Sequence, residues 1–124
     1  MILPVPDIDA AASFYAHVLG IPGTRVSGGR HYFDCRGTIL ACYDALADGD
    51  PEQVGPNPQY VYFDIDDLNA AHKRADEAGC RELSDIEVQP WGERSFYARD
   101  PFGNPILHGH RCWHAWSFLI RATR

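Results

Sequence analysis

Residues 89–104 read QPWGERSFYARDPFGN, and this stretch decides the fold. Side chains within 94–99 alternate between two faces, which is the pattern of a β-strand. Asp100 and Pro101 then open a tight turn, and Gly103 closes it. Apolar residues resume directly after the turn, so the stretch predicts a β-hairpin. A hairpin of this kind identifies a fold and leaves the activity open.

Two helices are expected, and they resemble each other. The first runs from Asp7 or Asp9 to Leu19, and the second runs from Asp66 to Ala78. Each begins with acidic residues and stops before a glycine, which are the usual signals at the two ends of a helix. An offset of 60 residues superimposes the two segments and indicates an internal repeat, pairing Val5 with Ile65 and Ala11 with Ala71.

Strand-like runs follow both helices in the same order. They lie at 24–27, 30–36 and 38–43 in the first half, and at 81–83, 94–99 and 105–108 in the second. A further strand is expected at 59–65, ahead of the second helix, whereas its counterpart ahead of the first helix is short. Gly37 and Gly103 mark equivalent hairpins. Each half is therefore predicted to be a βαβββ module.

The predicted architecture is a single α+β domain in which two βαβββ modules form a cupped mixed β-sheet. The first module spans 1–44, a linker rich in Asp, Gly and Pro spans 45–57, the second module spans 58–110, and a divergent tail spans 111–124. A helix protects only one face of each sheet, so the other face needs a partner or a ligand.

Composition limits the classes of function. The 124 residues carry a net charge of −6 without a stripe of Lys and Arg, which argues against a nucleic-acid partner. No apolar run approaches the ~20 residues of a membrane span, and residues 1–9 lack the basic region of a secretory signal. The 4 cysteines are widely spaced without a C-x-x-C pair, which favours buried free thiols in a reducing compartment. We therefore expect a cytoplasmic protein that binds neither nucleic acid nor membrane.

The hairpin stretch is similar to the PWG, F, RDP and GN signature of bleomycin-resistance-like proteins. These belong to the vicinal oxygen chelate superfamily, together with glyoxalase I, extradiol dioxygenases and fosfomycin resistance proteins. The resemblance covers about residues 1–110 and implies the glyoxalase/bleomycin-resistance-like fold. It also implies where a metal would be held, because enzymes of this superfamily bind a divalent ion with His, Glu or Gln from the first and last strand of each module.

Transferred to this chain, those four positions hold no metal ligand. Tyr60 and Leu107 occupy the positions of the second module, Ala41 occupies one position of the first, and the last falls before Met1. These side chains are poor ligands for hard or borderline divalent ions. His108 adjoins Leu107, but a shift of one residue turns a side chain to the opposite face of the sheet. We therefore expect neither a metal nor another cofactor.

The resemblance then implies a metal-free pocket lined by aromatic side chains, as in the bleomycin-resistance branch, where a dimer encloses a planar cationic drug and sequesters it. Alternation along 59–65 directs Tyr60 and Tyr62 toward the cavity. Stacking on rings and the negative net charge both favour a small aromatic or cationic organic molecule, and we expect a homodimer. The candidate ligand-binding residues are Tyr60, Tyr62, Trp91, Phe102, Phe33, Tyr43, Asp64 and Glu93.

Two alternatives remain open beside this metal-independent binding protein. One is a metal-dependent lyase, isomerase or dioxygenase of the same superfamily, with a metal held by other residues such as His31, His108 or His110. The other is a structural or regulatory module that binds a protein through its exposed sheet.

The C-terminal tail allows two interpretations. Extended backbone would place four zinc ligands on one face, namely His108, His110, Cys112 and His114. The apolar residues of the tail could instead pack against the body of the protein or against a second subunit.

Overall fold

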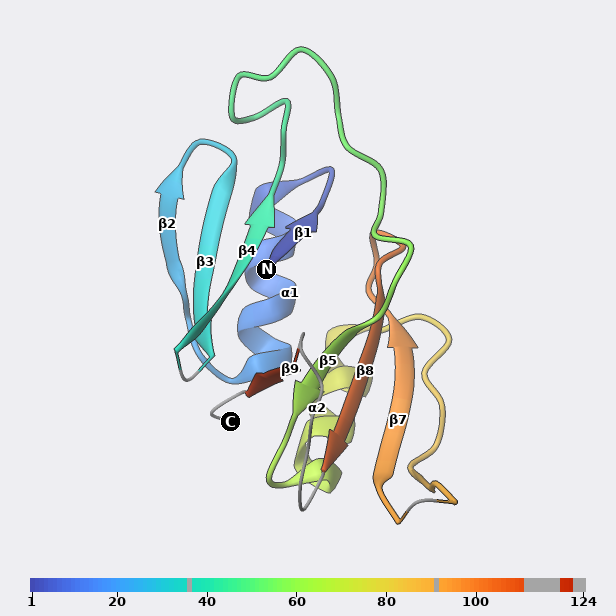
Figure 1. Ribbon diagram of the computed structural model, residues 1–124. Coiled ribbons are helices and arrows are strands. Elements are labelled where there is room, and N and C mark those ends of the chain that lie inside the picture. Colours follow the sequence, from blue (N-terminus) through green and yellow to red (C-terminus); the bar gives the residue numbers. More distant parts are fainter. Residues whose placement is uncertain (36, 91, 111–118, 122–124) are drawn as a thin grey trace.

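The computed structural model describes residues 1–35, 37–90, 92–110 and 119–121 of the chain. Its strands form two sheets, in the orders β1-β4-β3-β2 and β6-β7-β8-β5-β9. Figure 1 shows the two sheets as separate halves of the molecule, with α1 beside the first and α2 beside the second. The elements are β1 (Ile2–Pro4), α1 (Ile8–Leu19), β2 (Thr24–Ser27), β3 (Arg30–Cys35), β4 (Thr38–Tyr43), β5 (Val61–Asp64), α2 (Leu68–Ala78), β6 (Glu87–Val88), β7 (Arg94–Arg99), β8 (Pro105–His110) and β9 (Leu119–Arg121).

Both sheets are mixed, and their pairing follows one plan. The strand ahead of each helix pairs in parallel with the last strand of its own half, β1 with β4 and β5 with β8. Apart from β9, which pairs in parallel with β5, the remaining neighbours pair antiparallel, including the two hairpins β3–β4 and β7–β8. The α+β fold built from two βαβββ units is therefore confirmed.

The two helices begin and end with the same chemistry. A side-chain oxygen of Asp7, and likewise of Asp67, accepts a hydrogen bond from a backbone N–H of the first turn at 3.1 Å. Gly20 and Gly79 end the helices with φ of 74° and 85°, a left-handed conformation that glycine adopts without steric cost. The equivalence of these caps confirms the internal repeat.

One hydrophobic core crosses from the first half to the second. Alternate residues of the strands face the helices and are buried, as expected for 61–65, and α1 and α2 also pack against each other. The intervening residues point to the other side of each sheet, which we call its helix-free face. The largest buried side chains include Tyr15, Phe33, Phe63, Phe96, Leu40 and Ile106. Within the described residues, neither helix is long and apolar enough to cross a bilayer.

The predicted strand at 81–83 is wrong. Only Arg81 pairs there, through an isolated bridge to Arg99, because Glu82 has a φ of 50° that interrupts extended backbone. The edge strand forms later instead, as β6. Part of the predicted tail also contributes a strand, since β9 pairs in parallel with β5 and extends the second sheet.

The turn at 100–104, which we call the junction turn, joins the two halves. The Tyr15 hydroxyl of α1 donates a hydrogen bond to Asp100 Oδ2 at 2.6 Å. Asn104 Nδ2 donates to the carbonyl oxygen of Pro4 in β1 at 2.8 Å. Asp100 and Asn104 have no exposed surface, so these bonds lie inside the protein. The turn of the hairpin that identifies the fold therefore also holds the two halves together through hydrogen bonds.

Candidate functional site

The helix-free face of the second sheet carries an unusual set of buried polar side chains. Tyr62 and Asp64 alternate with core residues of β5, and they pair in register with Leu107 and Gly109 of β8. Tyr62 and Asp64 are only 2% and 5% exposed. Burial of a carboxylate is costly unless other groups compensate its charge, so Asp64 makes this face electrostatically distinctive.

Glu93 and Tyr62 converge over Gly109. A Cβ atom added to Gly109 would collide with the Tyr62 hydroxyl and would lie 2.9 Å from Glu93 Oε2. Glu93 is 8% exposed, and it immediately precedes β7. The absence of a side chain at Gly109 therefore leaves room for a phenol and a carboxylate to meet on the helix-free face.

Further polar and aromatic groups border this pair. The rings of Tyr60 and Tyr97 meet edge to face, with centroids 5.3 Å apart. Ser95 pairs in register with Gly109, and its Oγ accepts a hydrogen bond from Gln89 Nε2 at 3.1 Å. Tyr97 and Ser95 were not among the residues predicted to line a site. The alternation along 94–99 was the available signal, because it places both of them on the face opposite Phe96.

The other predicted ligand-binding residues lie elsewhere. Tyr43 stands on the helix-free face of the first sheet, where the Arg30 guanidinium lies 4.4 Å from its ring centroid. Phe33 is fully buried in the core on the helix side, and Phe102 packs against that core 6.3 Å from Phe14. Trp91 lies outside the described residues. The structure thus brings together four predicted residues on the second sheet, which are Tyr60, Tyr62, Asp64 and Glu93.

The residues at the positions where a metal would be held do not fit one. Ala41 is buried on β4, Leu107 lies opposite Tyr62, and Tyr60 is 45% exposed just ahead of β5. Ala41 and Leu107 have no donor atoms in their side chains. Across residues 1–35, 37–90 and 92–109, no three side chains of His, Cys, Asp or Glu are grouped to hold an ion.

The histidines named as alternative ligands do not supply a site either. His108 faces α2 and stacks on Phe96, with ring centroids 4.6 Å apart and planes 3° from parallel. His31 also lies on a helix side, with Nε2 3.0 Å from the carbonyl oxygen of Pro22. The side chain of His110 lies outside the described residues. Moving the expected ligand position by one residue along β8, from Leu107 to His108, therefore places an imidazole on the helix side of the sheet. The alternation of side chains along a strand predicts this result.

Thiol chemistry has no support in the described cysteines. Burial raises the pKa of Cys35 to about 11, and it raises the pKa of Cys42 and Cys80 to about 12. Because the thiolate is the reactive form, thiols with such values are inert near neutral pH. These three cysteines are free.

Comparison with known proteins identifies the family. The model of the glyoxalase/bleomycin resistance protein/dioxygenase superfamily matches residues 1–107. The chain belongs to this superfamily. A protein of Mycobacterium tuberculosis described as uncharacterized is 33% identical to it over 54 residues, which are 44% of this chain and 32% of that relative. The superfamily member described here thus spans about a third of the length of the curated relatives it matches.

Solved structures with different named activities share the fold of this superfamily member. A bleomycin resistance determinant encoded on the transposon Tn5 aligns with a TM-score of 0.67 and 21% identity, over 90% of this chain and 95% of that one. A lactoylglutathione lyase from Agrobacterium tumefaciens aligns with a TM-score of 0.63 and 24% identity, over 89% and 90%. Similarity at this level establishes the fold alone, and the function must come from the site.

Proposed function

We propose that this protein binds a small aromatic or cationic organic molecule without a metal ion and acts by sequestering it, as an antibiotic-binding protein does. The observation that carries the proposal is the pairing of Tyr62 with Glu93 on the helix-free face of the second sheet. Both side chains are buried, and both converge over Gly109. Glu93 supplies a negative charge for a cationic ligand, and the ring of Tyr60, which is 45% exposed and lies beside Tyr97, supplies a ring surface.

The side chains at the positions where superfamily enzymes hold a metal support the same proposal. Ala41 and Leu107 would contribute methyl groups where a superfamily enzyme contributes ligands. A lyase, isomerase or dioxygenase mechanism that depends on a divalent ion therefore lacks its first requirement in the described residues. Binding by charge and ring contact needs no such ion.

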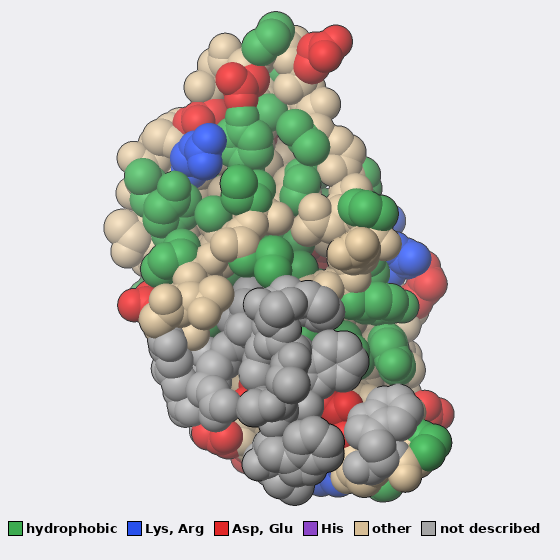
Figure 2. Space-filling model, viewed as in Figure 1, with side chains coloured by type: hydrophobic (Ala, Val, Ile, Leu, Met, Phe, Trp, Pro, Cys, Tyr) green, Lys and Arg blue, Asp and Glu red, His purple; other side chains and the backbone are tan. Residues whose placement is uncertain are grey.

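The proposal includes a homodimer in the cytoplasm. Ile2, the first residue of β1, and Met1 before it are large apolar residues with exposed fractions of 53% and 42%. Figure 2 shows hydrophobic side chains on much of this side of the first half of the molecule. An exposed apolar surface of this kind suits a second copy. The free thiols of the described cysteines are the state that a reducing compartment maintains.

Glu93→Gln tests the proposal. The variant keeps the shape of the side chain and removes its charge, so affinity for the planar cation proflavine should fall about tenfold. Affinity for acridone, a neutral planar analogue, should change less than twofold. Fluorescence titration of both probes measures the two dissociation constants.

The matched control is Glu52→Gln, because Glu52 is exposed in the linker and lies outside the site. It should leave both dissociation constants unchanged. The proposal would be refuted if Glu93→Gln and the unmodified protein bound proflavine with equal affinity. It would also be refuted if neither protein bound proflavine.

A further inference from the structure

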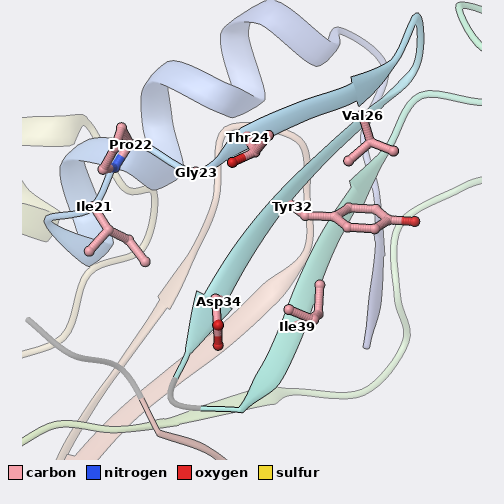
Figure 3. A pocket seen from close by; sticks show the side chains of 8 residues that line it. All are labelled: Ile21, Pro22, Gly23, Thr24, Val26, Tyr32, Asp34 and Ile39. Atoms are coloured by element: carbon pink, nitrogen blue, oxygen red, sulfur yellow. The ribbon is translucent and has the colours of Figure 1, made fainter.

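A groove opens on the first sheet, on the opposite half of the molecule from Tyr62 and Glu93. Its volume is about 520 Å³, within the usual range of small-molecule sites. Figure 3 shows that the loop after α1 and the strands β2, β3 and β4 all contribute walls. Tyr32 and Asp34 alternate with the core residue Phe33, so they lie on the helix-free face.

The surface that lines the groove is mainly apolar. Ile21, Val26 and Ile39 line it, together with the ring of Tyr32. Val26 and Ile39 are 52% and 38% exposed, so the groove leaves apolar surface in contact with water. Covering this surface with an alkyl chain would stabilise a complex by about 25 cal/mol for each Å² of apolar area removed from water.

One end of the groove is negatively charged. Asp34 is the only charged residue among the described residues that line it. The carboxylate is exposed, and its Oδ1 accepts a hydrogen bond from the backbone N–H of Gly37 at 2.9 Å. Gly37 has a φ of 95°, which permits the tight hairpin that holds Asp34 in this position. The lining therefore pairs an apolar wall with a fixed anion.

We propose that this groove binds an amphipathic amine, with an alkyl body against Ile21, Val26 and Ile39 and an ammonium group beside Asp34. The occupant follows from charge complementarity, since a single carboxylate in an aliphatic groove selects a cation over a neutral or anionic molecule of the same shape. The site is separate from the proposed drug site on the second sheet, and neither proposal depends on the other.

Octylammonium, octanoate and 1-octanol form a matched set of probes, because they share an alkyl chain and differ in charge. Octylammonium should bind with a dissociation constant of about 0.5 mM, the affinity expected when a ligand of this size makes average contacts. Titrating it into ¹⁵N-labelled protein should shift the backbone amide signals of residues 23–26, 34 and 37–39. Octanoate should cause no saturable shift.

Asp34→Asn is the decisive variant, because an asparagine oxygen can still accept the bond from Gly37. It should lower the affinity for octylammonium at least fivefold and leave the affinity for 1-octanol unchanged. The control Asp50→Asn, at an exposed acid outside the groove, should change neither affinity. Shifts that map to the second sheet, or an Asp34→Asn affinity within twofold of the unmodified protein, would overturn the assignment.

Discussion

Replacing Asp100 by alanine is expected to lower the free energy of unfolding by about 3 to 5 kcal/mol. The buried carboxylate accepts four hydrogen bonds, from the Tyr15 hydroxyl, from the Asn104 side chain and from the backbone N–H groups of Phe102 and Asn104. Removing it leaves those donors without an acceptor inside the protein. Urea unfolding followed by circular dichroism measures the loss.

Two further variants separate this effect from a general loss of charge. Tyr15→Phe removes only the hydrogen bond from the Tyr15 hydroxyl to Asp100 and should cost about 1 to 2 kcal/mol. Asp85→Ala, at an acid outside the core, should cost less than about 0.5 kcal/mol. A loss below about 1 kcal/mol for Asp100→Ala would contradict the role that we give the junction turn.

The second large effect concerns His108 and acid. Its imidazole has no exposed surface, and neither ring nitrogen has a hydrogen-bond partner within the described part of the chain. Burial, together with the nearby charges of Arg74 and His72 on α2, lowers the pKa of His108 to about 3. An unfolded histidine has a pKa of about 6.5, so between these values the unfolded state binds a proton that the folded state does not.

We therefore expect the free energy of unfolding to have its full value above about pH 6.5. It should fall as the pH is lowered from about 6.5 toward 3. At pH 5 the contribution of His108 to the loss is about 2 kcal/mol relative to pH 7.5. His108→Leu removes the titrating group and two unpaired polar atoms, so it should stabilise the protein by about 1 to 3 kcal/mol at pH 7.5.

Urea unfolding of both proteins at pH 7.5 and pH 5 tests this account. The difference in stability between His108→Leu and the unmodified protein should grow by about 2 kcal/mol at the lower pH. The other histidines are common to both proteins, so their titration cancels in the comparison. An equal difference at both pH values would show that His108 is not held in its neutral form.

The local chemistry of the chain was sufficient to predict most of the fold. The acidic caps and the terminal glycines located both helices, because each of these signals acts within one turn. The prediction of a strand at 81–83 was wrong because a glutamate gives no sign in the sequence that its backbone will be left-handed, as that of Glu82 is. The pairing of β9 with β5 is a long-range contact, and local patterns carry no information on it.

The candidate site was only partly predictable. Alternation correctly separated Tyr62 from Phe63, since the side-chain period of a strand is two residues. The same argument along 30–35 would have assigned Phe33 to the core, whereas its aromatic character alone suggested a cavity wall. The meeting of Glu93 with Tyr62 depends on the register between β7, β8 and β5. That register follows from the folded sheet and not from any local motif.

Calorimetric titration of the unmodified protein with proflavine, in excess chelator and again with added Mg²⁺, Mn²⁺ or Zn²⁺, tests the central claim most directly. Because Ala41 and Leu107 offer no ligand atoms, the account predicts the same dissociation constant and the same stoichiometry in every buffer. Proflavine binding that appears only when one of the metals is present would contradict it.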